Sequence, residues 1–159
     1  MMYWRSGRVD CGDVTEVTTS IDIDAPVEDV WRTVMDPERL GDWVTIHRRL
    51  ISHSKDAMEQ VLCLRGANFK VKWHLATNDA PHHAHWEGRG PAHSHAETEY
   101  RLSDNGRGGT RFDYRNEFKA PLGPLGAIAS RALVGGLPAK EADASLKRLK
   151  RLMEHGNHR

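Results

Sequence analysis

Residues 122–154 read LGPLGAIASRALVGGLPAKEADASLKRLKRLME, and this segment is the only one in the chain with sustained helical periodicity. Apolar side chains recur at steps of three and four residues along one face: Leu125, Ile128, Ala132, Ala142, Leu146, Leu149 and Met153. Because charged side chains occupy the opposite face, the pattern predicts an amphipathic helix with one buried stripe. Residues 135–138, GGLP, weaken a continuous helical ladder, so we expect a kink there.

The chain begins its ordered part with an alternating segment. Apolar or threonine side chains alternate with polar ones in residues 14–24, which predicts a strand with one buried side. Residues 24–28, DAPVE, then indicate a helix start, with Asp24 as the N-cap and Pro26 in the first turn. Residues 36–40, DPERL, begin a second short helix in the same way. The first helix is expected to bury Val27, Val30, Trp31 and Val34.

Six further strands are predicted before the last helix, because turn residues separate six alternating runs: 44–53, 58–65, 69–77, 83–89, 93–103 and 110–119. A sheet with one apolar face must cover that face, and the terminal helix is the only element long enough. We therefore predict an α+β fold in which a curved seven-stranded antiparallel sheet wraps around a long kinked C-terminal helix, with two short helices after the first strand. The space between sheet and helix is where we expect a ligand.

Composition places the chain among ordinary globular proteins. Its 159 residues are 38% hydrophobic and 28% charged, which suits a single domain at 14–156 after a mobile leader at 1–13. The formal net charge of +1 argues against nucleic acid as a partner. No apolar run is long enough to cross a membrane, and two cysteines, Cys11 and Cys63, are too few for a disulfide framework. We expect a cytoplasmic monomer or homodimer without stable membrane insertion.

Several short motifs recur in a known combination: IDIDAP at 21–26, VW at 30–31, DPERL at 36–40 with Trp43, WEGRGP at 86–91, GTRF at 109–112, NEF at 116–118 and GPLG at 123–126. With these motifs, the chain from about residue 14 to 154 resembles the START-like, or Bet v 1-like, helix-grip superfamily (SRPBCC), and within it the polyketide cyclase/dehydrase-type proteins. The resemblance implies binding of hydrophobic or amphipathic ligands such as lipids, sterols, hormones or aromatic polyketides. Some members are cyclases or aromatases.

The resemblance also implies a role for the predicted strand at 69–77. In the aromatase/cyclase members this strand carries an inward tryptophan together with a serine and an arginine that orient the oxygens of the substrate. Trp73 matches the tryptophan, but the next inward positions are Leu75 and Thr77, which weakens the case for polyketide cyclisation. Arg48 or Arg115 would supply a guanidinium only if the face assignment slipped by one residue.

Side chains on the predicted inner faces are the candidate ligand contacts, because aromatic rings supply apolar area while indole and phenol groups orient a ligand. These candidates are Trp43, Phe69, Trp73, Trp86, Tyr100, Phe112 and Tyr114, with Leu125, Ile128 and Ala132 facing them from the last helix. The alternative for each is plain core packing. No nucleophile or metalloprotease motif occurs, so no catalytic residue is assigned, and any catalysis would rest mostly on proximity.

Histidines crowd residues 82–95: His82, His83, His85, His93 and His95. Four of them on two adjacent strands could project from one face and bind zinc or nickel. The alternation instead places them opposite Trp86 and Ala96, on the solvent side, so we expect exposed, titrating histidines and neither a metal nor a cofactor. The carboxylates of the last strands also fall on outer faces, which argues against paired-carboxylate catalysis: Glu97, Glu99, Asp113 and Glu117.

Three functions remain open. The leading hypothesis is a polyketide cyclase/dehydrase-like protein that binds a small hydrophobic or aromatic ligand in the internal cavity, with cyclase or aromatase activity undecided. The second is a non-catalytic lipid or isoprenoid carrier or chaperone, and the third is a protein-interaction module with a filled core. Few polar groups in the cavity would favour the carrier, whereas a cluster of inward arginine, tyrosine and hydroxyl side chains would favour the enzyme.

Overall fold

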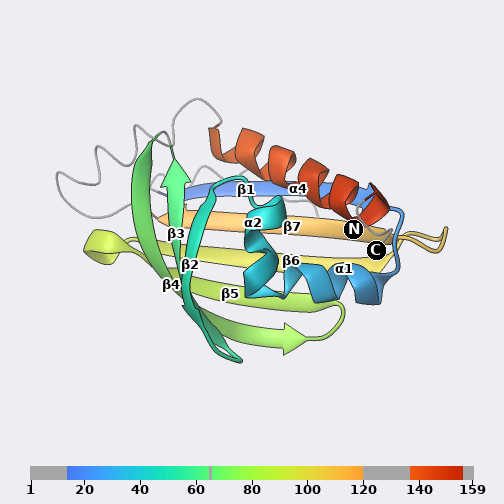
Figure 1. Ribbon diagram of the computed structural model, residues 1–159, viewed down its shortest axis with the longest axis horizontal. Helices are drawn as coiled ribbons and strands as arrows, with labels where there is room; N and C mark the ends of the chain where they lie inside the picture. The colour runs from blue at the N-terminus through green and yellow to red at the C-terminus, as the bar shows by residue number, and fades with distance from the viewer. Residues whose placement is uncertain (1–13, 65, 120–136, 156–159) are drawn as a thin grey trace.

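Seven antiparallel strands form one sheet, and the helices α1, α2 and α4 lie on one face of it (Figure 1). The computed structural model describes residues 14–64, 66–119 and 137–155. The sheet order is β1-β7-β6-β5-β4-β3-β2, so the first strand lies beside the last. The bounds are β1 Val14–Ile23, β2 His47–His53, β3 Ala57–Leu64, β4 Ala67–Asp79, β5 His83–Arg89, β6 His95–Asp104 and β7 Thr110–Lys119.

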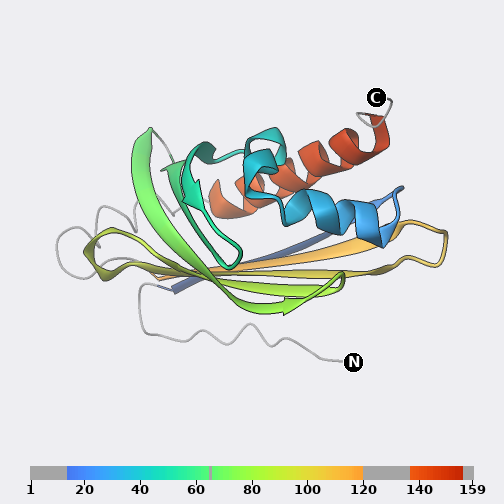
Figure 2. The same cartoon turned by 60° about the horizontal axis from the view of Figure 1, so that its bottom comes forward.

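The helices fall where the sequence predicts them. α1 Val27–Val34, η1 Pro37–Arg39 and α2 Leu40–Trp43 follow β1, the last two at the predicted second short helix, and α4 Leu137–His155 ends the described chain. A further short helix, η2 Pro91–His93, was not predicted. Figure 2 shows the sheet curving around the helical layer, with β4 the most strongly bent strand. This arrangement is the predicted α+β architecture.

The predicted alternation sets the faces of the sheet. In β1, Ile23 is fully buried while Glu16 is exposed. β1 pairs with β7 in an unbroken register that runs from Val14 opposite Lys119 to Ile23 opposite Thr110. The register fixes which side chains of the two strands share the inner face, because side chains alternate along every strand.

α4 covers the inner face of the sheet with the predicted stripe. Its buried apolar side chains are Ala142, Leu146, Leu149 and Met153. The helix contacts β1 and α2. Among the described helices none combines the length and apolar character needed to span a membrane. The helix expected at 122–154 is described only from Leu137 onward, so its first half and its kink, like the leader at 1–13, lie outside the described residues.

Trp43 at the end of α2 joins the helical layer to the sheet. Its side chain is buried, and its ring centroid lies 6.0 Å from that of Tyr100 and 6.3 Å from that of Phe112, both in edge-on geometry. The rings of Tyr100 and Tyr114 stack with their centroids 6.0 Å apart. Such aromatic pairs each contribute about 0.5–1.5 kcal/mol beyond their burial. The short helix is therefore held against β6 and β7.

The first helix departs from prediction in two places. Its N-cap is Pro26, and no side chain caps it, so the prediction of Asp24 as the cap is wrong. Trp31, expected to be buried, is half-buried and packs at the edge of the core.

The second strand starts later than predicted, at His47 instead of residue 44. Before it, the Thr45 N–H donates to Ser145 Oγ of α4 at 3.0 Å, while the Ile46 carbonyl oxygen already accepts from the Cys63 N–H of β3 at 2.8 Å. A side chain of the helix thus competes for the hydrogen bond that a strand would have used.

Irregular backbone also changes two predictions. A bulge between Leu75 and Thr77 in β4 leaves Thr77 exposed, so its predicted inward position is wrong. Residues 93 and 94 are not in β6, and His93 ends η2 with a φ of 63°. His82 precedes β5 and shares a hydrogen bond between its Nδ1 and the Leu102 carbonyl oxygen at 3.0 Å.

Candidate ligand-binding site

Two adjoining cavities lie between the inner face of the sheet and α4. The first, here the aromatic lobe, has a volume of about 60 Å³ and is walled by Trp43, Trp73, Trp86, Tyr100 and Tyr114 among others. The second, here the aliphatic lobe, has a volume of about 120 Å³ and is walled by Val17, Leu64, Phe69, Val71 and Phe118 among others. Trp73, Tyr114, Asn116, Ala142 and Ser145 line both lobes, so the two lobes share part of their walls.

Neighbouring strands supply the wall of the aromatic lobe because each contributes an inward position to it. Trp73 comes from β4, Trp86 from β5, Tyr100 from β6 and Tyr114 from β7, and Trp86 pairs directly with Thr98 on β6. Gly88 makes room for one of these rings, since a Cβ there would lie 2.7 Å from Cε3 of Trp73. The indole of Trp73 therefore lies flush against the backbone of β5.

Three buried polar atoms of lining residues have no hydrogen-bond partner among the described residues: Trp43 Nε1, Trp73 Nε1 and Asn116 Oδ1. The other amide atom of Asn116, Nδ2, donates to Tyr114 Oη at 3.1 Å, which fixes the amide and leaves its oxygen available. A buried polar group without a partner costs about 1–3 kcal/mol, and native proteins rarely leave such groups unsatisfied. The aromatic lobe therefore offers two donors and one acceptor to whatever occupies it.

The phenols of the lobe are neutral. Burial raises the pKa of Tyr100, and the neighbouring Tyr114 raises it further. Burial also raises the pKa of Tyr114, against the smaller opposing effects of its hydrogen bonds with Asn116 and Thr98. No described lysine, arginine, histidine or carboxylate lines the aromatic lobe. Its polar character comes from uncharged groups only.

Two polar contacts at the cavity were not predicted. Gln60, which lines the aromatic lobe, is buried and shares a hydrogen bond with His47 Nδ1 at 2.7 Å. Thr45 Oγ1 hydrogen-bonds to Glu141 Oε2 and lies 3.1 Å from Ser145 Oγ, which ties the segment after α2 to the helix. Gln60 shares its strand face with two apolar residues, so alternation alone could have placed it inward.

The predicted contacts are distributed unevenly. Five of them, Trp43, Trp73, Trp86, Tyr100 and Tyr114, line the aromatic lobe, and Phe69 lines the aliphatic lobe. Phe112 is fully buried beside Trp43 and Tyr100 and is not among the described lining residues of either lobe. Leu125, Ile128 and Ala132 lie outside the described residues.

No arginine of the described strands brings its guanidinium to the lobes. Arg48 is exposed, and Arg115 lies on the outer face, where it contacts Glu16 at 3.2 Å and Glu117 at 2.7 Å. The face assignment made from alternation is therefore right at Arg115, and the inward arginine of the aromatase/cyclase pattern has no counterpart among the described lining residues.

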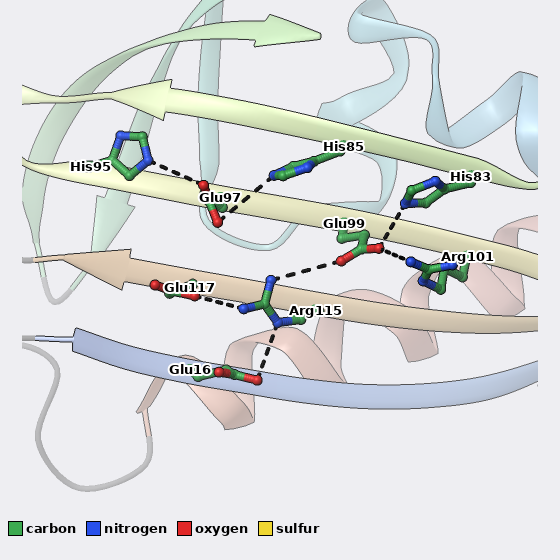
Figure 3. A network of polar contacts seen from close by, with 9 residues as sticks. All are labelled: Glu16, His83, His85, His95, Glu97, Glu99, Arg101, Arg115 and Glu117. Atoms are coloured by element: carbon green, nitrogen blue, oxygen red, sulfur yellow. Dashed lines mark hydrogen bonds and ion pairs between the residues drawn. The ribbon is translucent and has the colours of Figure 1, made fainter. Parts of the chain in front are cut away.

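His82 and His93 are exposed as predicted, whereas the other three predicted histidines are only partly exposed on the outer face. Figure 3 shows them beside glutamates: His83 Nε2 lies 2.7 Å from Glu99, while His85 Nε2 lies 3.9 Å and His95 Nε2 3.6 Å from the two oxygens of Glu97. All three histidines are half-buried. Their surroundings are thus a network of charges rather than open solvent.

Neighbouring groups in this network stabilise the ionised forms of Glu99 and Arg115. Burial alone would raise the pKa of Glu99, but its hydrogen bond with His83 and the charge of Arg101 outweigh burial and hold the pKa below its ordinary value. Burial likewise opposes the charge on Arg115, yet the hydrogen bond and charge of Glu16 outweigh it and raise the pKa of the guanidinium. Both groups are charged at neutral pH.

Comparisons with known proteins agree with this architecture. Residues 14–154 match the family described as polyketide cyclase/dehydrase and lipid transport. An uncharacterized protein of Mycobacterium tuberculosis is 28% identical over 150 residues, which cover 87% of this chain and 99% of that protein. The resemblance inferred from the sequence motifs is confirmed.

Solved structures show the same fold. A conserved protein from Geobacillus kaustophilus is similar with a TM-score of 0.73 at 18% identity, over 91% of this chain and 98% of that one. A START superfamily protein from Mycobacterium smegmatis is similar with a TM-score of 0.71 at 12% identity, over 89% and 99% of the two chains. The predicted helix-grip fold is confirmed.

Proposed function

Because this chain belongs to the polyketide cyclase/dehydrase and lipid transport family, we propose that it binds a small aromatic molecule bearing a hydroxyl group between the sheet and α4. The observation that carries the proposal is the set of buried, unpartnered atoms in the aromatic lobe, namely the indole nitrogens of Trp43 and Trp73 and the amide oxygen of Asn116. A hydroxyl group matches this set, because its oxygen accepts from an indole N–H and its proton is donated to an amide oxygen.

The size of the space supports a ligand of one or two rings. The lobes have volumes of about 60 Å³ and about 120 Å³ and share part of their walls. A buried apolar cavity of roughly 150 Å³ accommodates benzene. The ring would lie among the aromatic side chains, and an attached alkyl group would extend into the aliphatic lobe beside Phe69 and Phe118.

The proposal is for binding rather than acid–base catalysis. The tyrosines of the aromatic lobe have raised pKa values, and no described group that titrates near neutral pH lines this lobe. An efficient general acid or base needs a pKa near the working pH. Any acceleration by this site would come from holding a flexible ligand in a reactive shape.

The test compares 2-naphthol with naphthalene, which differ only in the hydroxyl group. In Trp73→Phe the ring is largely retained and the N–H is lost. We expect the variant to bind 2-naphthol about threefold to tenfold more weakly and naphthalene with little change, since one hydrogen bond is removed. Calorimetric titration measures both affinities.

The control for this test is Trp31→Phe, because Trp31 lies on α1 and is not among the described lining residues of either lobe. The Trp31→Phe variant should bind 2-naphthol and naphthalene with the same affinities as the unaltered protein. Equal weakening of both probes by Trp73→Phe, or no binding of 2-naphthol to the unaltered protein, would contradict the proposal.

A second candidate function is a carrier for an acyl or isoprenoid chain. The aliphatic lobe favours it, because Val17, Leu64, Val71 and Phe118 give it a largely apolar wall, although Glu141 also lines it. Farnesol is a suitable probe. If farnesol binds more tightly than 2-naphthol and its affinity falls in Phe118→Ala but not in Trp73→Phe, the carrier function replaces the aromatic-ligand function.

A further inference from the structure

Four glutamates lie in one row across the outer face of the sheet. The strand registers place Glu87 opposite Glu97, Glu97 opposite Glu117, and Glu117 opposite Glu16. Like charges directly opposite each other on neighbouring strands destabilise a sheet. A row of four carboxylates therefore requires compensating positive charge.

Arginine compensates only one half of the row. Arg115 contacts Glu16 at 3.2 Å and Glu117 at 2.7 Å. On the other half, the described ion pairs of Glu97 are with His85 and His95, at 3.9 Å and 3.6 Å, and Glu87 has none among the described residues. An imidazole is neutral over much of the physiological pH range, so this half keeps two carboxylates with little permanent positive charge beside them.

The geometry points to a divalent transition-metal site, with zinc as the best fit, formed by His85, Glu87 and Glu97. One ligand atom from each residue lies within 4.8 Å of the other two. His85 Nε2 is buried and has no hydrogen-bond partner among the described residues. The sheet holds the three side chains together because His85 and Glu87 lie two residues apart on the same face of β5 while Glu97 faces Glu87 from β6.

The separation of His85 Nε2 from Glu97 Oε2 supports a shared metal ion. At 3.9 Å it is too long for a hydrogen bond. Two ligand atoms that are each about 2.1 Å from a tetrahedral zinc ion lie roughly 3.4 Å apart, so a small movement brings both into coordination. The other oxygen of Glu97 lies 3.6 Å from His95 Nε2, and Figure 3 shows the two histidines approaching the carboxylate from opposite ends. His95 thus places a second imidazole beside the same carboxylate.

The donor set selects the class of metal. An imidazole nitrogen suits zinc, copper and nickel, whereas magnesium and calcium prefer sites made only of oxygen. One histidine and two carboxylates leave a coordination position for water. The site lies on the opposite face of the sheet from the cavity, and Trp86, between His85 and Glu87 in the sequence, lines the aromatic lobe. A zinc ion bound there would therefore link β5 to β6 on the face of the sheet opposite the cavity.

The experiment titrates zinc into the full chain, prepared without a polyhistidine tag and freed of metal with a chelator. Calorimetry should show one zinc ion bound per chain. His85→Gln and Glu97→Gln should each weaken zinc binding by at least about tenfold. The matched control is His83→Gln, because His83 lies on the same face of the same strand but already bonds to Glu99 at 2.7 Å. Its zinc affinity should be unchanged.

Circular dichroism in the presence of the chelator checks that each variant folds, and cobalt supplies an optical readout of the coordination geometry. The cobalt spectrum of a four-coordinate site should appear in the unaltered protein and in His83→Gln and be lost in His85→Gln. Unchanged zinc affinity in both His85→Gln and Glu97→Gln overturns the inference. Equal weakening of zinc binding in His83→Gln also overturns it. The inference is overturned as well if Glu97→Gln abolishes zinc binding, His85→Gln retains it, and magnesium competes with zinc.

Discussion

The two faces of the same strands differ in whether their polar side chains are paired within the protein. On β7, Tyr114 faces the cavity and Arg115 faces outward, and on β5, Trp86 faces the cavity while His85 and Glu87 face outward. The outer face pairs most of its charges with neighbouring charges of opposite sign. The inner face instead leaves uncharged donors and an acceptor unpaired within apolar surroundings. The difference supports the proposal that a ligand completes the hydrogen bonds of the inner face, whereas most charges of the outer face are paired within the protein.

The largest effect is expected where α4 closes the inner face. Leu149 is fully buried and is not among the described lining residues of either lobe. Leu149→Ala should lower the free energy of unfolding by about 2–5 kcal/mol, because it removes buried contacts and leaves a void. Urea denaturation measures the change. The neighbouring Leu152 is only half-buried, so Leu152→Ala should cost clearly less. Equal losses at the two positions would contradict this account of the helix.

The next largest effect tests the fit of one ring against the inner face. A Cβ on Gly88 would lie 2.7 Å from the ring of Trp73, so Gly88→Ala must displace the indole. We expect a loss of about 1–3 kcal/mol in the free energy of unfolding, from overpacking, together with a change in tryptophan fluorescence. Gly41→Ala is the control, since its Cβ would meet only His47 Cδ2 at 3.6 Å. A Gly88→Ala protein with unaltered stability and fluorescence would show that Trp73 is not packed as described.

On the outer face the central cation is Arg115, whose side chain is 23% exposed and contacts three glutamates. Arg115→Gln should lower the free energy of unfolding by about 1–2 kcal/mol at low salt, because carboxylates in one row lose their shared partner. The loss should shrink in 1 M salt, where the Debye length is about 3 Å. Arg111→Gln, which breaks an exposed pair with Asp113, should cost less than about 0.5 kcal/mol. Equal losses in the two variants would contradict a central role for Arg115.

The smallest effect separates the two halves of the glutamate row. In metal-free protein, Glu97→Gln should raise the free energy of unfolding by up to about 0.5 kcal/mol, because it relieves repulsion from the carboxylates opposite. Glu117→Gln should lower it, since Glu117 accepts a 2.7 Å hydrogen bond from Arg115. The two residues lie opposite each other, and thermal denaturation of the two variants gives the sign of each change in the free energy of unfolding. Changes of the same sign would remove the asymmetry on which the metal site depends.

The parts of the fold that follow from local periodicity were predictable. Alternation gave the bounds of β7 and the inner-face residues of β4 to β7 apart from Thr77, and three-to-four spacing gave the buried stripe of α4, because burial on one side imposes these periods directly. The bulge after Leu75 was not predictable, since it depends on how β4 pairs with β5. The start of β2 depends likewise on a hydrogen bond from Thr45 to Ser145, a hundred residues further along the chain.

The candidate site divides in the same way. Alternation placed Trp73, Trp86, Tyr100 and Tyr114 on the inner face, and the structure brings them to one lobe. That Asn116 bonds to Tyr114 and leaves its oxygen unpaired depends on side-chain geometry, which no sequence period encodes. The glutamate row depends on the registers of four strands at once, so single-strand alternation could place its members outward but not opposite one another.

The central claim is that the inner face completes its hydrogen bonds with a ligand, and the indole N–H resonances report on this directly. With 2-naphthol added to nitrogen-15-labelled protein, the indole N–H protons of Trp43 and Trp73 should shift downfield on saturation, while that of Trp31 should not move. Naphthalene should produce smaller shifts, because it has no oxygen to accept the bond. If the Trp43 and Trp73 resonances respond to the two compounds alike, or do not respond at all, the inner face is an ordinary packed core and the account is wrong.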